Sequence, residues 1–214
     1  MSRILIIGGH GKIALLLAPL LEARGDEVTS VVRNPDHVDD VRAAGAATLV
    51  LDVAAADTKA LSDAFSGYDA VVWSAGAGGG DAARTYAVDR DAAIRAMDAA
   101  EVAGASRFVM VSWIGSSPDH GIDPSDSFFP YADAKLAADE HLRRSSLEWT
   151  VLGPGTLTSD DATGRITTEP TGRGEISRAD VAQVIAATLG DAATIRRTIR
   201  FGAGETPIAE ALSA

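Results

Sequence analysis

The chain has 214 residues, of which 46% are hydrophobic and only 5% aromatic, and its formal net charge is −11. So acidic a balance argues against nonspecific binding to nucleic acid or to an anionic membrane. The absence of cysteine excludes disulfides and cysteine-ligated zinc, and the four histidines show no metal-ligand spacing. No apolar run reaches the roughly 18 residues of a membrane span. We therefore expect a cytoplasmic protein without a metal site.

Short apolar runs alternate with helical patterns as far as residue 154. Strands that alternate with helices of ten or more residues form β-α-β units, whose right-handed crossovers place helices on both faces of a parallel sheet. The sequence therefore predicts an α/β fold with a doubly wound parallel sheet. In chain order, the predicted strands are 3–8, 27–33, 47–52, 69–76, 106–113 and 148–154, and the predicted helices are 12–25, 35–45, 57–67, 85–104 and 131–145.

Local signals support several of these boundaries. Gly25 suits the C-terminal cap of the first helix, whereas Pro19 inside it removes a hydrogen bond and favours a kink. Pro35 suits the first turn of the second helix.

The chain becomes polar and rich in Gly and Thr after residue 155, which predicts a loop over 156–175 with at most one short strand. A helix capped by Ser177, with Asp180 three residues later, covers 177–191, and a last strand covers 194–202. No linker or repeat is present, so we predict one domain over 1–214. Its substrate-side elements are expected at about 154–180.

The stretch "GGHGKIA" follows the first strand and opens the first helix. Its spacing is Gly8-x-x-Gly11-x-x-Ala14. Glycines let the backbone approach a pyrophosphate, whose charge is stabilised by the free N–H groups at a helix N-terminus. This context favours dinucleotide binding over a plain β-α turn, which remains the alternative. The predicted contacts are Gly8, Gly9, His10, Gly11, Lys12 and Ile13.

The ends of the next strands predict the rest of the cofactor site. Arg33 ends the second strand, where an acid would hold the 2′-hydroxyl of NAD(H); a guanidinium suits the 2′-phosphate of NADP(H). The alternative is an Arg33 that is ion-paired on the surface. Further contacts are expected from Asp52, Val53, Ser74, Ala75 and Gly76, with the glycine-rich loop 76–80 near the site.

The stretch "YADAK" places Tyr131 and Lys135 four residues apart, on one face of a predicted helix. A nearby ammonium lowers the pKa of a phenol, which would let Tyr131 exchange a proton with a carbonyl oxygen. The alternative is an exposed helix that begins with an aromatic residue.

Taken together, the motifs resemble those of atypical short-chain dehydrogenases/reductases of the NmrA-like kind. The resemblance is carried by "GGHGKIA", "VVRNP", "LDV", "VSWIGS", "YADAKLAADEHLRRSSLEWTVLGPGTLT", "GEISRADVAQVI" and "GAGETPIAEAL". It implies a Rossmann fold with NADP(H) bound at Gly8, Gly11 and Arg33. It also implies that Tyr131 and Lys135 form the catalytic pair, with Lys135 holding the nicotinamide ribose as well.

Two departures concern the active site. The family has paired serines where this chain has Ser112 followed by Trp113. Ser112 is therefore the first candidate for the hydroxyl that polarises the substrate carbonyl, and Ser116 is the second. Gly153 stands where relatives carry arginine, which removes a cation near the nicotinamide.

The expected function is NADPH-dependent reduction of a small carbonyl or quinone-like substrate, by a monomer or homodimer. Trp113 and the loop 116–130 are expected to form an apolar substrate wall lined by Phe128 and Phe129; the alternative is that these two aromatic residues only anchor the loop. The alternatives are a redox-sensing regulatory protein without turnover, and an epimerase or isomerase with bound cofactor.

Overall fold

The computed structural model describes residues 1–78 and 81–213. Within these residues nine strands form one large sheet in the order β11-β8-β10-β6-β5-β4-β1-β2-β3. The seven strands from β3 to β10 in this order are parallel. The predicted doubly wound α/β fold is confirmed, and its strand order reverses between β1 and β4.

The elements of the N-terminal half follow the predicted alternation. They are β1 (Arg3–Ile7), α1 (Lys12–Ala23), β2 (Glu27–Val32), a 3-10 turn (Pro35–His37), α2 (Val38–Ala43), β3 (Ala47–Val50), α3 (Thr58–Phe65), β4 (Ala70–Trp73), α4 (Ala82–Thr85), a π-helical segment (Tyr86–Ala92) and α5 (Ala93–Ala103).

The elements of the C-terminal half are shorter beyond β6. They are β5 (Arg107–Val111), α6 (Phe129–Arg144), β6 (Glu148–Pro154), β7 (Thr156–Thr158), β8 (Arg165–Thr167), β9 (Glu175–Ser177), α7 (Arg178–Gly190), a 3-10 turn (Ala192–Thr194), β10 (Arg197–Ala203), β11 (Thr206–Pro207) and α8 (Ile208–Ser213).

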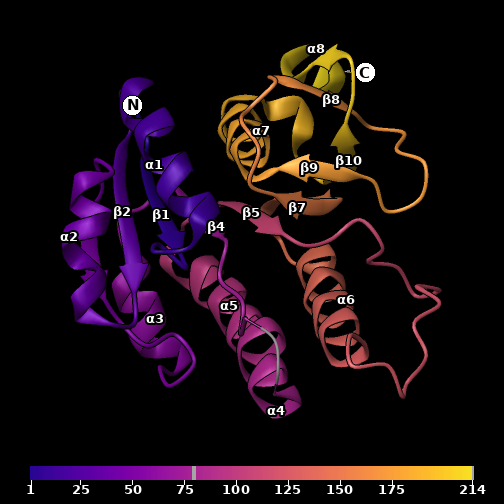
Figure 1. Cartoon of the computed structure of the whole chain (residues 1–214). Coiled ribbons are helices and arrows are strands. Elements are labelled where there is room, and N and C mark those ends of the chain that lie inside the picture. Colours follow the sequence, from indigo (N-terminus) through magenta and orange to yellow (C-terminus); the bar gives the residue numbers. More distant parts are fainter. Residues whose placement is uncertain (79–80, 214) are drawn as a thin grey trace.

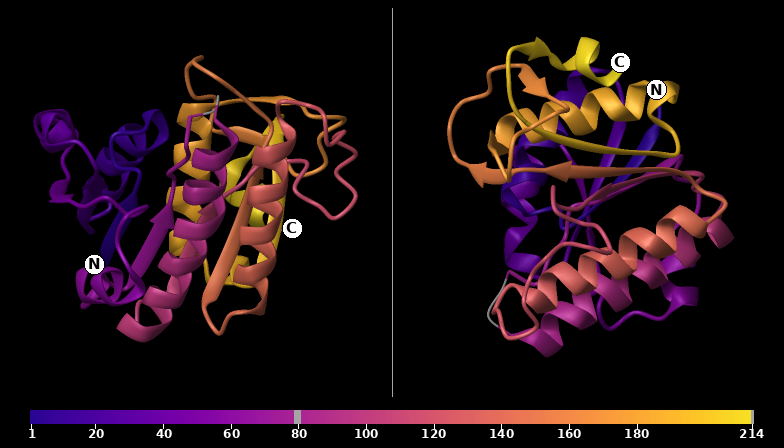
Figure 2. Two further views of the ribbon diagram at one scale, coloured as in Figure 1. Left: turned by 90° about the horizontal axis from the view of Figure 1, so that it is seen from below. Right: turned by 90° about the vertical axis from the view of Figure 1, so that its right-hand side faces the viewer.

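Helices cover both faces of the sheet because the side chains of each strand alternate between two cores. In β1, Ile4 and Ile6 belong to the core cluster that includes residues of α1, α7 and α8, whereas Leu5 and Ile7 belong to the one that includes residues of α3 and α5. The two layers are clear on either side of the sheet in Figure 2, and Figure 1 shows α6 beside α5 on the second face. None of the helices in the described part of the chain is long and apolar enough to span a membrane.

The region after β6 is more ordered than its composition suggests. Instead of a loop with one strand, it contains β7, β8 and β9; β7 pairs with β9, and β8 pairs antiparallel with β10. Gly155 permits this arrangement, because a Cβ there would lie 2.5 Å from the carbonyl oxygen of Arg173. The short elements β11 and α8 also lay outside the sequence prediction.

Three predicted helices differ in detail. The helix expected over 85–104 is divided into α4, a π-helical segment and α5. The helix expected over 35–45 begins as a 3-10 turn, with Pro35 in its first turn as predicted. Pro19 lies inside α1, which nevertheless continues to Ala23, and Gly25 follows the helix with a φ of +89°.

Candidate active site

A pocket of about 380 Å³ lies at the carboxyl ends of β1, β2, β3 and β4. We call it the glycine-loop pocket. It sits where the strand order reverses, which is where parallel α/β sheets bind their ligands. Most of the predicted cofactor contacts line it: Gly8, Gly9, His10, Gly11, Arg33, Asp52, Val53, Ser74, Ala75 and Gly76. Other lining residues, including Asn34, His37, Arg84 and Val88, had no motif to mark them.

The glycines hold the loop tightly against two strand ends. Gly8 has a φ of +85°, and a Cβ there would lie 2.6 Å from backbone atoms of Ala75. A Cβ on Gly9 would lie 2.4 Å from the Cβ of Ser30. The N–H of Gly11 donates to the carbonyl oxygen of Gly8 at 2.8 Å and closes the turn. Larger residues would therefore push the loop into the pocket or away from the sheet.

The beginning of α1 fits a phosphate-bearing cofactor. Gly11 is its N-cap, no side chain caps the helix, and its first turn contains no acidic residue. The first N–H groups of such a helix have no partner within the helix and attract anions. Ala14 is fully buried, as expected of the third small position. Two predicted contacts lie outside the lining: Lys12 is exposed, and the side chain of Ile13 belongs to the core.

Arg33 lies on the wall formed by the end of β2. Among the described residues it forms no ion pair, so the surface ion pair considered as an alternative is not observed. The imidazole of His10 stacks on that of His37, with ring centroids 3.7 Å apart, and its Nε2 lies 2.8 Å from Oδ2 of Asp40. Both histidines line the pocket with Arg33. This wall therefore combines the Arg33 guanidinium with a stacked pair of imidazoles, one of which pairs with Asp40.

A second, larger pocket of about 840 Å³ adjoins the first, because Gly76 lines both. Phe128, Pro130 and Tyr131 contribute one wall, and Ala77, Gly78, Asp81, Ala82 and Thr85 another. We call it the Tyr131 pocket. Of the glycine-rich loop expected near the site, residues 76–78 belong to this wall, and Gly79 and Gly80 lie outside the described residues.

Tyr131, Lys135 and Asp139 follow one another at intervals of four residues on α6, as predicted for the first two. The Nζ of Lys135 donates to the carbonyl oxygen of Val111 at 2.8 Å and lies 3.1 Å from the sulfur of Met110. Lys135 is fully buried and lines neither pocket. It therefore anchors α6 to the end of β5 instead of presenting its ammonium at a pocket wall.

Ser112 and Ser116 point to the same buried carboxylate. Their hydroxyls donate to Oδ2 of Asp139 at 2.5 and 2.6 Å. Both serines are buried and neither lines the Tyr131 pocket. The structure thus pairs the two candidate serines with each other through Asp139, and it does not present Ser112 to a substrate carbonyl.

A fourth ionisable group, Asp89 of the π-helical segment, lies close to these residues. Its Oδ2 accepts the N–H of Ala77 at 3.0 Å, and it is buried. π-Helical segments are frequent at functional sites. The sequence patterns did not identify Asp89 as a site residue. The one indication was an acidic residue on the buried side of an alanine-rich helix.

Burial dominates the acid–base properties of this cluster. It raises the pKa of Asp89 and Asp139, although Lys135 opposes both shifts, and it lowers the pKa of Lys135. Burial, followed by the negative charges of Asp89 and Asp139, raises the pKa of the Tyr131 phenol above its ordinary value. The expected lowering by Lys135 is therefore wrong: burial and the two carboxylates raise the pKa of Tyr131, and the Nζ of Lys135 is directed at Val111.

The two family departures have structural explanations. The Trp113 ring packs over Gly115, where a Cβ would lie 2.1 Å from Cζ3 of the indole. Gly153 is paired in register with Arg200 of β10, whose Cγ would lie 3.4 Å from a Cβ on Gly153. Arg200 also donates from Nη2 to the carbonyl oxygen of Ser116 at 3.4 Å. A neighbouring strand thus brings an arginine side chain against Gly153.

The comparisons with known proteins agree with this geometry. The sequence model of the NAD(P)H-binding family matches residues 8–192. A Bacillus subtilis protein named as an uncharacterized sugar epimerase, YhfK, is 33% identical, and the match covers 98% of each chain.

Two solved structures extend the comparison. One, a proposed NAD-dependent epimerase/dehydratase from Bacillus halodurans, is 34% identical with a TM-score of 0.92, covering 100% of this chain and 99% of that one. The other, the oxidoreductase ylbE from Lactococcus lactis, is 28% identical with a TM-score of 0.87, covering 99% and 95%. The chain therefore belongs to the NAD(P)H-binding Rossmann family, among relatives of the epimerase and reductase kind.

Proposed function

We propose that this protein is an NADPH-dependent reductase of a carbonyl or quinone-like compound. One observation carries the proposal: Tyr131 lines a pocket that meets the glycine-loop pocket at Gly76. A proton donor and a dinucleotide site are thereby placed on adjoining walls. This is the arrangement that combined hydride and proton transfer requires.

The chain's own residues suit the cofactor. Gly8, Gly9 and Gly11 bring the backbone to the phosphates, and the N–H groups at the start of α1 bind them. Asp52 and Val53 lie where β3 ends and would flank the adenine, and Ser74 and Ala75 the ribose. When bound, NADPH supplies a hydride to the carbonyl carbon and leaves as NADP⁺.

Tyr131 has the properties of the matching acid. The phenol keeps its proton at neutral pH and can donate it to the carbonyl oxygen as the C–O bond becomes a hydroxyl. Burial raises its pKa and so makes it a weaker acid, which requires that hydride transfer first builds negative charge on that oxygen. Lys135 and Asp139 act from within α6 by fixing the helix against β5 and against Ser112 and Ser116. They position Tyr131 without contacting the substrate.

A preference for NADP(H) over NAD(H) is supported by the wall that carries Arg33. Its guanidinium has no acidic partner among the residues described, and it has the charge and fork geometry that a 2′-phosphate requires. His10 and His37 stack on the same wall.

The decisive experiment has two stages. The purified protein is titrated with NADPH and NADH by calorimetry, and NADPH oxidation is then followed with a panel of quinones and aldehydes. Tight NADPH binding with turnover of at least one substrate supports the proposal. If neither nucleotide binds, the glycines form only a turn and the proposal fails.

A second candidate is a redox-sensing protein that binds NADP(H) without turnover. The hydrogen bonds from Ser112 and Ser116 to Asp139 favour it, because both candidate hydroxyls are engaged by that carboxylate and neither serine lines the Tyr131 pocket. Selective NADPH binding without oxidation across the panel would support this candidate over the reductase. An epimerase is supported only by the names of relatives, and it would leave the NADPH concentration unchanged while interconverting sugar isomers.

A further inference from the structure

A guanidinium lies over two aromatic rings, one of which, that of Phe128, lines the Tyr131 pocket. Arg173, in the loop between β8 and β9, has its Cζ 5.8 Å from the ring centroid of Trp113 and 5.5 Å from that of Phe128. The two rings meet edge to face at 5.1 Å. Two segments far apart in sequence thus converge on one aromatic surface.

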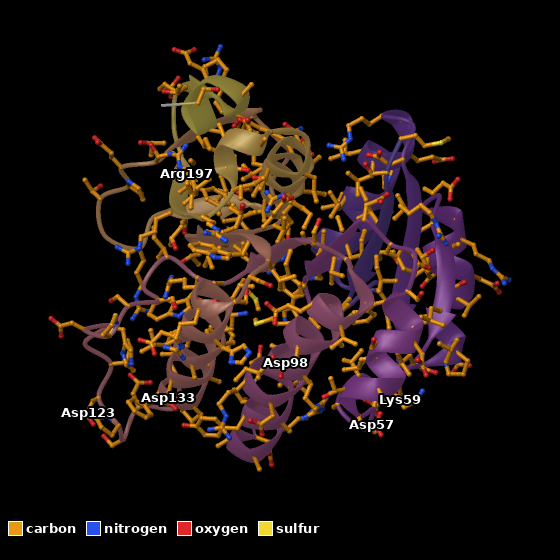
Figure 3. The ribbon with its side chains drawn as sticks, turned by 180° about the vertical axis from the view of Figure 1, so that it is seen from behind. Asp57, Lys59, Asp98, Asp123, Asp133 and Arg197 are labelled. Atoms are coloured by element: carbon orange, nitrogen blue, oxygen red, sulfur yellow. The ribbon has the colours of Figure 1, made fainter. Side chains whose placement is uncertain are left out.

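Phe128 connects this cation to the proposed proton donor. It lines the Tyr131 pocket, and its ring centroid lies 5.2 Å from that of Tyr131. Arg173 and Tyr131 therefore contact the same ring. In Figure 3, Asp133 marks the first turns of α6, and Asp123 marks the outer end of the loop that leads to Phe128. That loop extends outward from α6, and its return places Phe128 at the start of the helix.

The charge of Arg173 is not neutralised within the described residues, where it forms no ion pair. Its side chain is exposed. Arg200, also exposed, approaches the same Trp113–Ser116 segment from β10 and likewise lacks a carboxylate partner in the part of the chain described. Arg173 thus contacts a ring of the Tyr131 pocket, and Arg200 approaches the segment that carries Trp113, in a chain of net charge −11. A stacked guanidinium keeps its N–H edge free for an anion.

We propose that the substrate of the Tyr131 pocket is a conjugated ring carbonyl that carries a carboxylate, and that Arg173 binds this carboxylate. The ring lies against Phe128, which is wide enough to separate the carboxylate at Arg173 from the carbonyl oxygen at Tyr131. Arg200 adds to the positive potential at the same end. The inference rests on the proposed reductase function and names its substrate class.

The test compares two ligands that differ in one charge: a naphthoquinone carboxylate and the carboxamide of the same quinone. Binding of each is measured by calorimetry in the presence of NADP⁺, so that no turnover is needed. We expect the wild-type protein to bind the carboxylate about tenfold to a hundredfold more tightly, as a charge-assisted hydrogen bond allows. Arg173→Ala should remove this preference and leave carboxamide binding unchanged, and Arg173→Lys should retain part of it because the charge remains without the fork.

Arg144→Ala is the matched control. It removes the same charge from α6, about 20 Å along the helix from Tyr131, and breaks only an exposed pair with Glu140. Its preference should equal that of the wild type. Equal wild-type affinities for the two ligands, or equal weakening of both by Arg173→Ala, would overturn the inference. NADPH oxidation is measured separately. If the wild-type protein prefers the carboxylate but oxidises no NADPH, the reductase proposal is rejected and the proposed carboxylate site is retained.

Discussion

The two adjoining pockets differ in the atoms that form their walls. The glycine-loop pocket is built largely from strand ends and backbone, with Gly8, Gly9 and Gly11 on one side and Ser74 and Ala75 on the other. The Tyr131 pocket has one wall of larger side chains, from the end of a long loop and the start of α6, which faces the segments 76–78 and 81–85. A backbone wall tolerates little change and accepts one kind of ligand, whereas a side-chain wall sets which substrate is accepted.

The largest expected effect tests the side-chain wall. Tyr131→Phe removes the proposed proton donor but keeps the ring against Phe128, so turnover should fall by about 10²–10⁴-fold, the usual contribution of a positioned acid. NADPH affinity should be unchanged, because Tyr131 does not line the glycine-loop pocket. Steady-state rates and calorimetric titration of the same preparation measure both quantities. Undiminished turnover would show that another group donates the proton.

The backbone wall is tested by two matched glycine substitutions. Gly8 and Gly25 both have positive φ, so alanine at either should lower the free energy of unfolding by about 1–2 kcal/mol. Only at Gly8 would the new Cβ collide with backbone, that of Ala75, whereas nothing lies within 4 Å at Gly25. Gly8→Ala should therefore cost about 1–3 kcal/mol more and weaken NADPH binding.

Urea unfolding and nucleotide titration of both variants provide the measurement. Equal losses of stability at the two positions would mean that the loop moves freely away from β4, and the rigid cradle would be the wrong description.

The same contrast explains what the sequence could predict. Glycine spacing, strand ends and the Tyr131–Lys135 interval are local patterns, and they located the fold, most of the glycine-loop pocket and one face of α6. Asp89, Arg173 and Arg200 could not be located, because each reaches the site from a segment distant in sequence, through pairings such as β10 with β6. The direction of the Tyr131 pKa was mispredicted because the spacing of Tyr131 and Lys135 shows neither how deeply the fold buries the phenol nor that Asp89 and Asp139 lie near it.

A smaller effect is expected at the edge of the backbone wall, where a side chain selects the cofactor. Arg33→Asp should weaken NADPH binding by about tenfold to a hundredfold, since a charge-assisted contact to the 2′-phosphate is replaced by repulsion. NADH affinity should stay the same or rise. Arg42→Asp on α2 makes the same charge change away from the pocket lining and is the control. If both variants lose the same NADPH affinity, long-range charge and not a direct contact explains the preference.

The smallest expected effect is a single-turnover rate that does not change with pH. The Tyr131 phenol has an ordinary pKa of 10.0, and burial with Asp89 and Asp139 nearby raises it, so its deprotonation moves to higher pH. A single-turnover reduction that uses the protonated phenol should therefore keep a constant rate from pH 7 to about pH 10. The residual rate of Tyr131→Phe supplies the background at each pH, and the ratio of the two rates isolates the proton donor. A ratio that falls with a midpoint well below pH 10 would mean that bound cofactor or substrate reverses the balance between Lys135 and the two carboxylates. The side-chain wall of the Tyr131 pocket would then rearrange when its ligands bind.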